Sequence, residues 1–219
     1  MEFSKAFTFV FSDQGWIKKI LILGLVSLIP IIGQMVLLGW SLQITRQIIK
    51  DEVFNLPDLH FGEQLSLGFK GFVIALVFSL PALLFSLPSI AVGPLGEALE
   101  FDEQTLTPII LLVSVCCGGI QLIYSVGLAF FLPAAFGNFV DKGFLSAGFR
   151  LGELFRLVKA VPVAYLLVVV GSMLASFIAG LGIIACVIGA IFTFTYSQAV
   201  VAHLTGQAFR EAQAKSLVN

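Results

Sequence analysis

Four long runs of this chain contain no Asp, Glu, Lys or Arg: residues 20–45, 71–96, 104–140 and 160–209. A helix that crosses a bilayer needs about 20 consecutive apolar residues. Each run is at least that long, and the last has room for two crossings. The chain is 58% hydrophobic and only 11% charged, whereas about 25% of the residues of a soluble domain are charged. So few charges cannot cover a water-facing surface, which indicates an integral membrane protein.

The lengths and breaks of these runs predict an all-α, polytopic fold with about six membrane-inserted helices. Pro81 and Pro88 are expected to kink the helix of the second run or to end it early. The third run is expected to tilt, or to break near Gly118-Gly119 or Pro133. The predicted parts of a single membrane domain, 1–219, are an interfacial segment at 1–16, a helical hairpin at 17–50, transmembrane helices at 67–92 and 107–136, an interfacial helix at 143–159, a transmembrane hairpin at 160–204 that reverses at 179–182, and a cytoplasmic tail at 205–219.

The distribution of cations predicts the topology. All twelve Lys and Arg residues fall within the segments 5–19, 46–70, 142–159 and 210–215, whereas the loop at 97–103 carries four acids and no base. Segments rich in Lys and Arg stay in the cytoplasm. We therefore expect a multi-pass protein of the inner (cytoplasmic) membrane, with both termini cytoplasmic and the acidic loop outside.

This topology requires residues 17–50 to enter the membrane and return. Pro30 lacks an N–H donor and Gly33 tolerates unusual backbone angles, so they are expected to supply the bend. The first arm is about 20 Å long at 1.5 Å per residue, less than the ~30 Å hydrocarbon core. A re-entrant hairpin or a locally thinned crossing is expected, and a single tilted helix is the alternative. A short echo of this segment recurs at an offset of 156 residues, where Ile32-Gly33 and Trp40-Ser41 match Ile188-Gly189 and Tyr196-Ser197.

The segment 143–159 is amphipathic. Its apolar residues recur at helical spacing and are Leu151, Leu154, Phe155 and Val158. Arg150, Arg156 and Lys159 take neighbouring positions, so we expect an interfacial helix whose bases contact anionic headgroups. Simple extension of a membrane helix past the surface is the alternative.

The N-terminal segment shows a similar pattern. Phe3, Phe7 and Val10 predict an interfacial helix, with Ser12 or Asp13 as the N-cap of the helix that follows. Helix extension is again the alternative. A removable signal peptide is another interpretation of the N-terminal region, but no small-residue cleavage pattern follows the first apolar stretch. We therefore expect the N-terminus to be retained.

Few side chains are candidates for chemistry. No metal site and no cofactor is expected. His203, near the cytoplasmic end of the last helix, is the one candidate ligand for a haem or pigment, although a histidine there more often bonds a carbonyl or headgroup. His60 has no partner at metal-ligand spacing. The three cysteines, Cys116, Cys117 and Cys186, are interpreted as packing residues.

The remaining polar groups at membrane depth are uncharged. They are expected to form hydrogen bonds between helices, and a polar groove is the alternative. This set comprises Gln34, Gln43, Gln121, Tyr124, Ser125, Asn138, Tyr196, Ser197 and Gln198. Asn138 and Asp141 are expected to cap the third helix or to pair with Arg150.

Several landmarks occur in order along the chain. They are Phe11-Ser-Asp-Gln-Gly-Trp-Ile-Lys-Lys, Ile29-Pro-Ile-Ile-Gly, Gly39-Trp40 with Arg46, Leu56-Pro57-Asp58, Gly68-Phe-Lys-Gly-Phe followed by Leu80-Pro81, and Pro133-Ala134-Ala135 before Gly143. In this order and spacing, residues 1–205 resemble the domain-of-unknown-function 4013 family of uncharacterised prokaryotic membrane proteins. Leu59 departs from the pattern, because a tryptophan is expected near it. The resemblance implies a multi-pass helical protein and transfers no site residue.

These observations lead to two functional hypotheses. Because the uncharged runs hold no ionisable residue at membrane depth, ion-coupled transport is not expected. We expect a non-enzymatic scaffold or accessory subunit of a larger membrane complex, in contact with membrane lipids and other membrane subunits. The alternative is a carrier or scramblase for a lipid or a neutral amphiphilic solute, and an intramembrane enzyme comes third. The net charge of −1 argues against a nucleic-acid partner.

Overall fold

The secondary structure of the described residues is entirely helical, which confirms the predicted all-α class. The computed structural model describes residues 1–52 and 55–216, with the side chains of 185–188 outside that description. The predicted packing role of Cys186 therefore lies outside the described residues. The α-helices are α1 (Lys5–Thr8), α2 (Trp16–Ser27), α3 (Ile32–Ile49), α4 (Phe61–Ala98), α5 (Glu103–Lys142), α6 (Leu151–Ala160), α7 (Pro162–Leu181) and α8 (Cys186–Ser216), with 3-10 turns η1 (Phe9–Ser12), η2 (Leu145–Phe149) and η3 (Gly182–Ala185).

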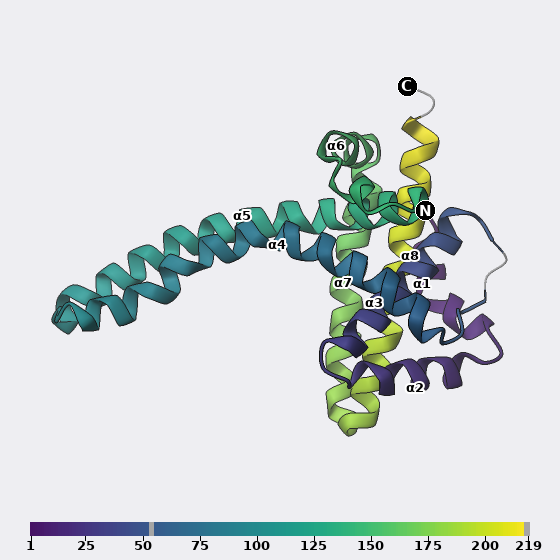
Figure 1. The fold of residues 1–219 in the computed structure, drawn as a ribbon, viewed down its shortest axis with the longest axis horizontal. Helices are drawn as coiled ribbons and strands as arrows, with labels where there is room; N and C mark the ends of the chain where they lie inside the picture. Colours follow the sequence, from purple (N-terminus) through teal and green to yellow (C-terminus); the bar gives the residue numbers. More distant parts are fainter. Residues whose placement is uncertain (53–54, 217–219) are drawn as a thin grey trace. The chain divides into compact units, whose positions relative to one another are not determined.

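The chain forms two compact units. Unit 1 comprises Met1–Ile74 and Phe130–Asn219, and unit 2 comprises Ala75–Ala129. Unit 2 consists of the C-terminal part of α4, the connection at 99–102 and the N-terminal part of α5, and the two helices run side by side (Figure 1). The Tyr124 hydroxyl donates to the Phe78 carbonyl at 2.6 Å, and Leu106 packs over Gly96 near the connection.

Among the described residues, three helices are long and apolar enough to cross a membrane: α4, α5 and α7, the last with its extension to Ile184. A polytopic helical fold is therefore supported by three candidate spans, whereas the predicted count of about six membrane-inserted helices is not confirmed. α2 has 12 residues, which amounts to about 18 Å of helix. That is well short of the ~30 Å hydrocarbon core.

α4 and α5 are longer than predicted. The expected ranges 67–92 and 107–136 become Phe61–Ala98 and Glu103–Lys142. Pro81, Pro88 and Pro94 all lie inside α4, so the expectation that proline ends this helix early is wrong. A proline removes one N–H donor, but an apolar segment that left the helix would expose many more backbone groups to lipid. The helix therefore loses less free energy by continuing through the prolines than by ending at one of them.

The chain turns between α2 and α3 at residues 28–31. The two helices contact each other, and Gln34 Nε2 donates to the Ser27 carbonyl across the turn at 2.7 Å. The unusual backbone angle falls on Ile31, with φ 65°, and not on Gly33 as expected. Gly33 has another role, because a Cβ there would overlap the Val26 carbonyl oxygen.

α8 is the central helix of unit 1. It contacts α1, α2, α3, α6 and α7, and it pairs with α7 as a long hairpin (Figure 1). The helix continues to Ser216, and Ala208, Phe209 and Ala212 are buried. The predicted tail at 205–219 is therefore corrected as far as residue 216: these residues are packed helix.

The two halves of the sequence echo lie next to each other. Thr45 Oγ1 of α3 donates to the Ala202 carbonyl of α8 at 3.1 Å, a separation of 157 residues along the chain. One turn further on, Gly206 packs against Ile48. α3 and α8 thus run parallel, and the separation of their contacting residues is close to the offset of 156 residues in the sequence echo.

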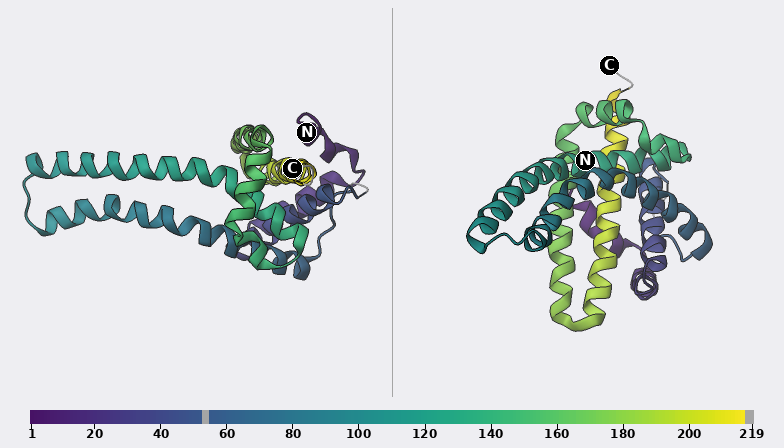
Figure 2. Two further views of the ribbon diagram at one scale, coloured as in Figure 1. Left: turned by 90° about the horizontal axis from the view of Figure 1, so that it is seen from above. Right: turned by 60° about the vertical axis from the view of Figure 1, so that its left-hand side comes forward.

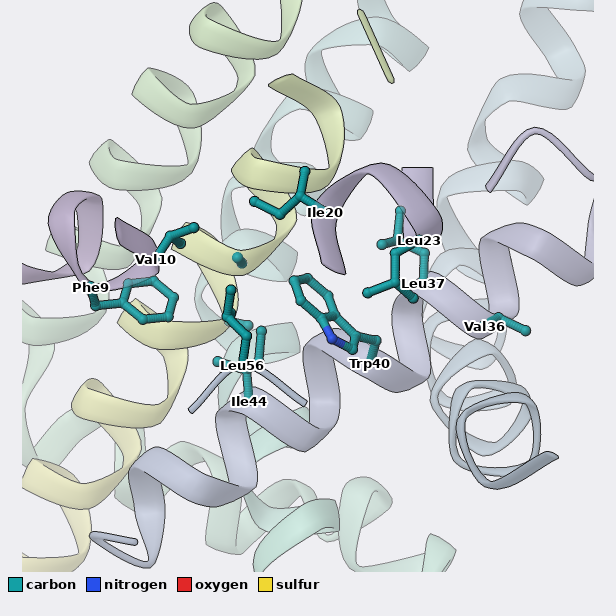
Figure 3. Packing of buried hydrophobic residues seen from close by; sticks show 11 residues of the cluster. Phe9, Val10, Ile20, Leu23, Val36, Leu37, Trp40, Ile44 and Leu56 are labelled. Atoms are coloured by element: carbon teal, nitrogen blue, oxygen red, sulfur yellow. The ribbon is translucent and has the colours of Figure 1, made fainter. Parts of the chain in front are cut away.

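The core of unit 1 joins the N-terminal segment to α2, α3 and α8. Figure 3 shows the Trp40 indole among Ile20, Leu37 and Ile44. Phe9 and Val10 belong to the same buried cluster. The segment is helical as predicted, in α1 and η1, and its side chains also pack on the protein: Val10 is buried, and Phe3 and Phe7 are half-buried. Its placement at the membrane surface stays a prediction.

The backbones of α3 and α4 touch. A Cβ on Gly68 would overlap the Met35 carbonyl oxygen, and one on Gly39 would overlap the Gln64 carbonyl oxygen. Backbone atoms cannot rotate away as a side chain can. The two glycines therefore set the distance between these helices.

We expect Gly68→Ala to destabilise the protein by about 1–3 kcal/mol or more, because the added methyl group must push two helices apart. The measurement is thermal unfolding in detergent, followed by the loss of the monodisperse peak on size-exclusion chromatography. Gly62→Ala, in the first turn of the same helix, is the matched control, since nothing lies within 4 Å of its Cβ position. Equal melting temperatures for the two variants would contradict the contact.

Candidate functional site

Most of the predicted polar side chains bond backbone carbonyls. Tyr196 Oη donates to the Phe7 carbonyl and Ser197 Oγ to the Ala175 carbonyl, each at 2.6 Å. Within unit 2, Tyr124 bonds Phe78 as described above. Gln121 and Gln198 are half-buried, and Ser125 is exposed. These bonds join helices and leave the hydroxyl donors occupied.

Two further amides of the same set, Gln43 and Asn138, are also bonded. Gln64 Nε2 donates to Gln43 Oε1 at 3.0 Å and to the Asp58 carbonyl at 2.8 Å. Asn138 Nδ2 donates to the Ala147 carbonyl at 2.8 Å. Asp141 accepts from Gln213 Nε2 at 2.7 Å. The expected pairing of Asn138 or Asp141 with Arg150 is not the arrangement found.

A buried ion pair holds the N-terminal segment to the loop before α4, and we call it the N-terminal clasp (Asp13, Lys19, Trp40, Leu56 and Pro57). Asp13 Oδ2 accepts from Lys19 Nζ and from the Leu56 N–H, both at 2.9 Å. Lys19 Nζ also donates to the Leu56 carbonyl at 2.6 Å. Trp40 Nε1 donates to the Pro57 carbonyl at 2.9 Å. The clasp brings together three of the landmarks on which the family resemblance rests.

Asp13 is not the predicted N-cap of α2. That position is Gly15, without a side-chain cap bond, and Asp13 Oδ1 accepts from the Gly15 N–H at 2.7 Å. Burial alone would raise the pKa of Asp13, but the hydrogen bonds from Lys19, Gly15 and Leu56 outweigh it and lower the pKa below 3.8. Sequence reasoning did not predict the Asp13–Lys19 contact. The two residues are six positions apart with a turn between them, and both are types that usually lie on the surface.

The clasp should make stability depend on pH. A carboxyl with a lowered folded pKa stabilises the protein above its unfolded pKa, near 4, and this contribution is lost as the pH falls through the folded value. Asp13→Asn should cost about 2–3 kcal/mol at neutral pH, the scale of hydrogen bonds to a charged group. Below pH 4 the difference between wild type and variant should shrink. Melting temperatures across this range test it, with Asp58→Asn, an exposed acid beside Lys19, as control.

A cavity of about 780 Å³ opens between α1, the end of α3 and the end of α8. His203 lies in its wall and is buried. The His203 ring packs against Phe9, with 4.3 Å between centroids, and its Nδ1 is 2.9 Å from Gln207 Nε2. Gln207 in turn bonds both backbone groups of Glu2. These contacts give His203 and Gln207 a role in holding the N-terminal segment on α8.

The rim of this cavity is charged. Arg210 pairs with Asp51, and Lys5 pairs with Glu2 at 2.9 Å. His60, the other histidine, is exposed, and its carbonyl accepts from the Gln64 N–H at the start of α4. Within the described part of the chain, no three His, Cys, Asp or Glu side chains are grouped as metal ligands.

A second polar cluster positions α6. Lys142 Nζ donates to Glu153 Oε1, and Asn138 Nδ2 donates to Glu153 Oε2 at 3.2 Å. The bond from Lys142 is the main cause of a lowered pKa of Glu153, against which burial acts in the opposite direction. Arg150 lies 3.9 Å from the same carboxylate and 5.2 Å from the Phe144 ring. Arg150 is one of the three residues predicted to contact lipid headgroups, together with Arg156 and Lys159. In the structure, its guanidinium lies near protein groups.

Unit 2 has an extended open apolar surface. In the most apolar 18-residue stretch of α5 no residue is buried, and the matching stretch of α4 is almost as open. Glycines contribute to this surface. Nothing lies within 4 Å of the Cβ positions of Gly93, Gly118, Gly119 and Gly127. Cys116 is exposed beside them and Cys117 is half-buried, with neither in a disulfide.

These features define the class: a protein whose described part is helical and contains three helices long and apolar enough to cross a membrane. Residues 22–188 match the family described as "Protein of unknown function (DUF4013)". The chain belongs to this family, as its landmarks predicted. The match begins after the Phe11–Lys19 landmark, so Asp13 and Lys19 lie outside it. No curated protein and no solved structure gives a significant match.

Proposed function

We propose that this chain is a non-enzymatic integral membrane protein that serves as a scaffold or accessory subunit of a larger membrane complex. The observation that carries the proposal is the open surface of unit 2. Lipid alone covers leucine and phenylalanine well, but glycines on an open helix face typically mark sites where another helix approaches closely. Gly118 and Gly119 leave such a face on α5.

The alternative of a carrier or scramblase receives less support. Its groove would need uncharged polar side chains that face the substrate. Tyr124, Tyr196 and Ser197 are instead bonded to backbone carbonyls. A carrier would have to break these hydrogen bonds during each transport cycle, and substrate binding would have to compensate for the lost free energy.

We expect Gly118→Leu to abolish co-purification of partner subunits with the tagged full-length chain in mild detergent. Nothing within this chain lies within 4 Å of the Cβ position of Gly118, which is exposed, so insertion and thermal stability should be unchanged. Gly180→Leu, at an equally open position near the end of α7, is the control and should retain the partners. A wild-type protein that purifies alone as a monomer would contradict the scaffold.

The proposed membrane arrangement places both termini and the cationic segments in the cytoplasm of a cell with an inner membrane, and the acidic connection of α4 and α5 outside. It places α2 and α3 in the membrane as a short hairpin, and α8 beside α7 as its return. In a cysteine-free background, Glu100→Cys should react with an impermeant maleimide in intact cells. Asn55→Cys should react only after lysis. Labelling of Asn55→Cys from outside would show that 17–50 crosses once.

A further inference from the structure

α6 presents three distinct stripes around its circumference. Leu154 and Leu157 are buried against unit 1, where α6 contacts α8. Leu151 and Phe155, one turn apart, are 60% and 58% exposed. Arg156 and Lys159 are exposed and, at 100° per residue, lie beyond Phe155 on the side away from the buried stripe. An open apolar stripe thus separates the protein from a basic stripe.

The orientation of α6 follows from α7. A single residue, Val161, separates the two helices, and Figure 2 shows α6 lying across the end of α7. α7 is one of the three helices long and apolar enough to cross a membrane. If α7 crosses, α6 therefore lies along the membrane surface. The first turn of α7, which follows directly in the chain, is open as well, since Val163 is 67% exposed.

In the part of the chain that the structure describes, no ion pair neutralises the two cations of the basic stripe. Glu153, the only acid of α6, is bonded by Lys142 and Asn138 on the buried side. Among the described residues, ion pairs include Arg150 but neither Arg156 nor Lys159. Anionic lipids are concentrated in the cytoplasmic leaflet, on the side where cationic segments remain. Charge and apolar surface therefore both match a lipid headgroup layer.

We propose that α6 is an interfacial anchor that binds anionic phospholipid, with Leu151 and Phe155 inserted among the acyl chains and Arg156 and Lys159 on the lipid phosphates. This inference rests on the membrane placement proposed above but does not depend on the scaffold role. A protein partner is a poorer match, because an open apolar stripe on a helix that directly precedes a membrane helix would be covered by lipid first.

The first test measures insertion in the full-length chain, reconstituted in phosphatidylcholine–phosphatidylglycerol vesicles with the three native cysteines replaced by serine. Spin labels are placed at Phe155→Cys, at Gly152→Cys on the basic side of α6, and at Met173→Cys on the exposed face of α7. Labels at 155 and 173 should be accessible to oxygen and shielded from a water-soluble nickel chelate. The label at 152 should be accessible to nickel.

A nickel-accessible label at 155 together with a shielded label at 173 would overturn the anchor and leave the membrane placement intact. Nickel access at both positions would overturn the placement and the anchor together. A shielded label at 155 in vesicles supports insertion, provided that the same label becomes nickel-accessible in a lipid-free amphipol complex. If it stays shielded there, protein and not lipid covers the stripe, and the anchor is wrong.

The second test measures lipid preference. In nanodiscs of mixed lipid, the number of phosphatidylglycerol molecules retained after gentle delipidation is counted by native mass spectrometry. Arg156→Gln with Lys159→Gln should lower the preference for phosphatidylglycerol over phosphatidylcholine by at least about fivefold, the effect of about one surface cation. Lys18→Gln with Lys215→Gln carries the same charge change at exposed positions elsewhere and should have little effect. Equal losses in both double variants would overturn a site on α6.

Discussion

Close van der Waals packing around α8 is the constraint on which unit 1 depends. Helices of this composition gain little from hydrophobic burial in lipid, so they associate where small residues let their surfaces meet. α8 supplies buried Ala199, Ala202 and Gly206. Its neighbours supply glycines of their own: a Cβ on Gly171 of α7 would overlap Leu204, and one on Gly137 of α5 would crowd Phe209. The N-terminal segment reaches α8 through Phe9 and His203.

Polar interactions hold the connecting segments of unit 1. The Asp13–Lys19 pair and the Lys142–Glu153 bond lie in segments that carry cations, and the Gln207 bonds to Glu2 lie just outside such segments. Unit 1 is thus joined by small-residue contacts along its helices and by partly buried hydrogen bonds at the helix ends, among them two between charged groups. α6 lies at one such end, held on one side by Glu153 and open on the other.

Particular residues show how far sequence patterns reach. The uncharged runs located every long helix, and the reversal near Gly182 was expected from glycine spacing. Pro81 and Pro88 were expected to kink the helix or to end it early, and α4 ends at neither, because proline breaks a helix in water more readily than in a segment whose backbone has no other partner. Phe3, Phe7 and Val10 predicted a helix in the N-terminal segment, but a periodic apolar face does not say whether protein or lipid covers it, and Val10 lies in the protein core. The landmarks identified the family but not the contacts among them.

The sequence by itself determined the class of protein, its helical content and the family, because runs of uncharged residues and the order of short motifs are local properties of the chain. Only the tertiary structure decided which side chains meet. Asp13 and Leu56, 43 residues apart, carry no mutual signal, and neither do Gly68 and Met35 across two helices. Such pairs depend on the angle and offset at which helices pack, and many arrangements of small residues satisfy the same pattern. The three-dimensional fold selects one, and with it the face of α6 that remains open.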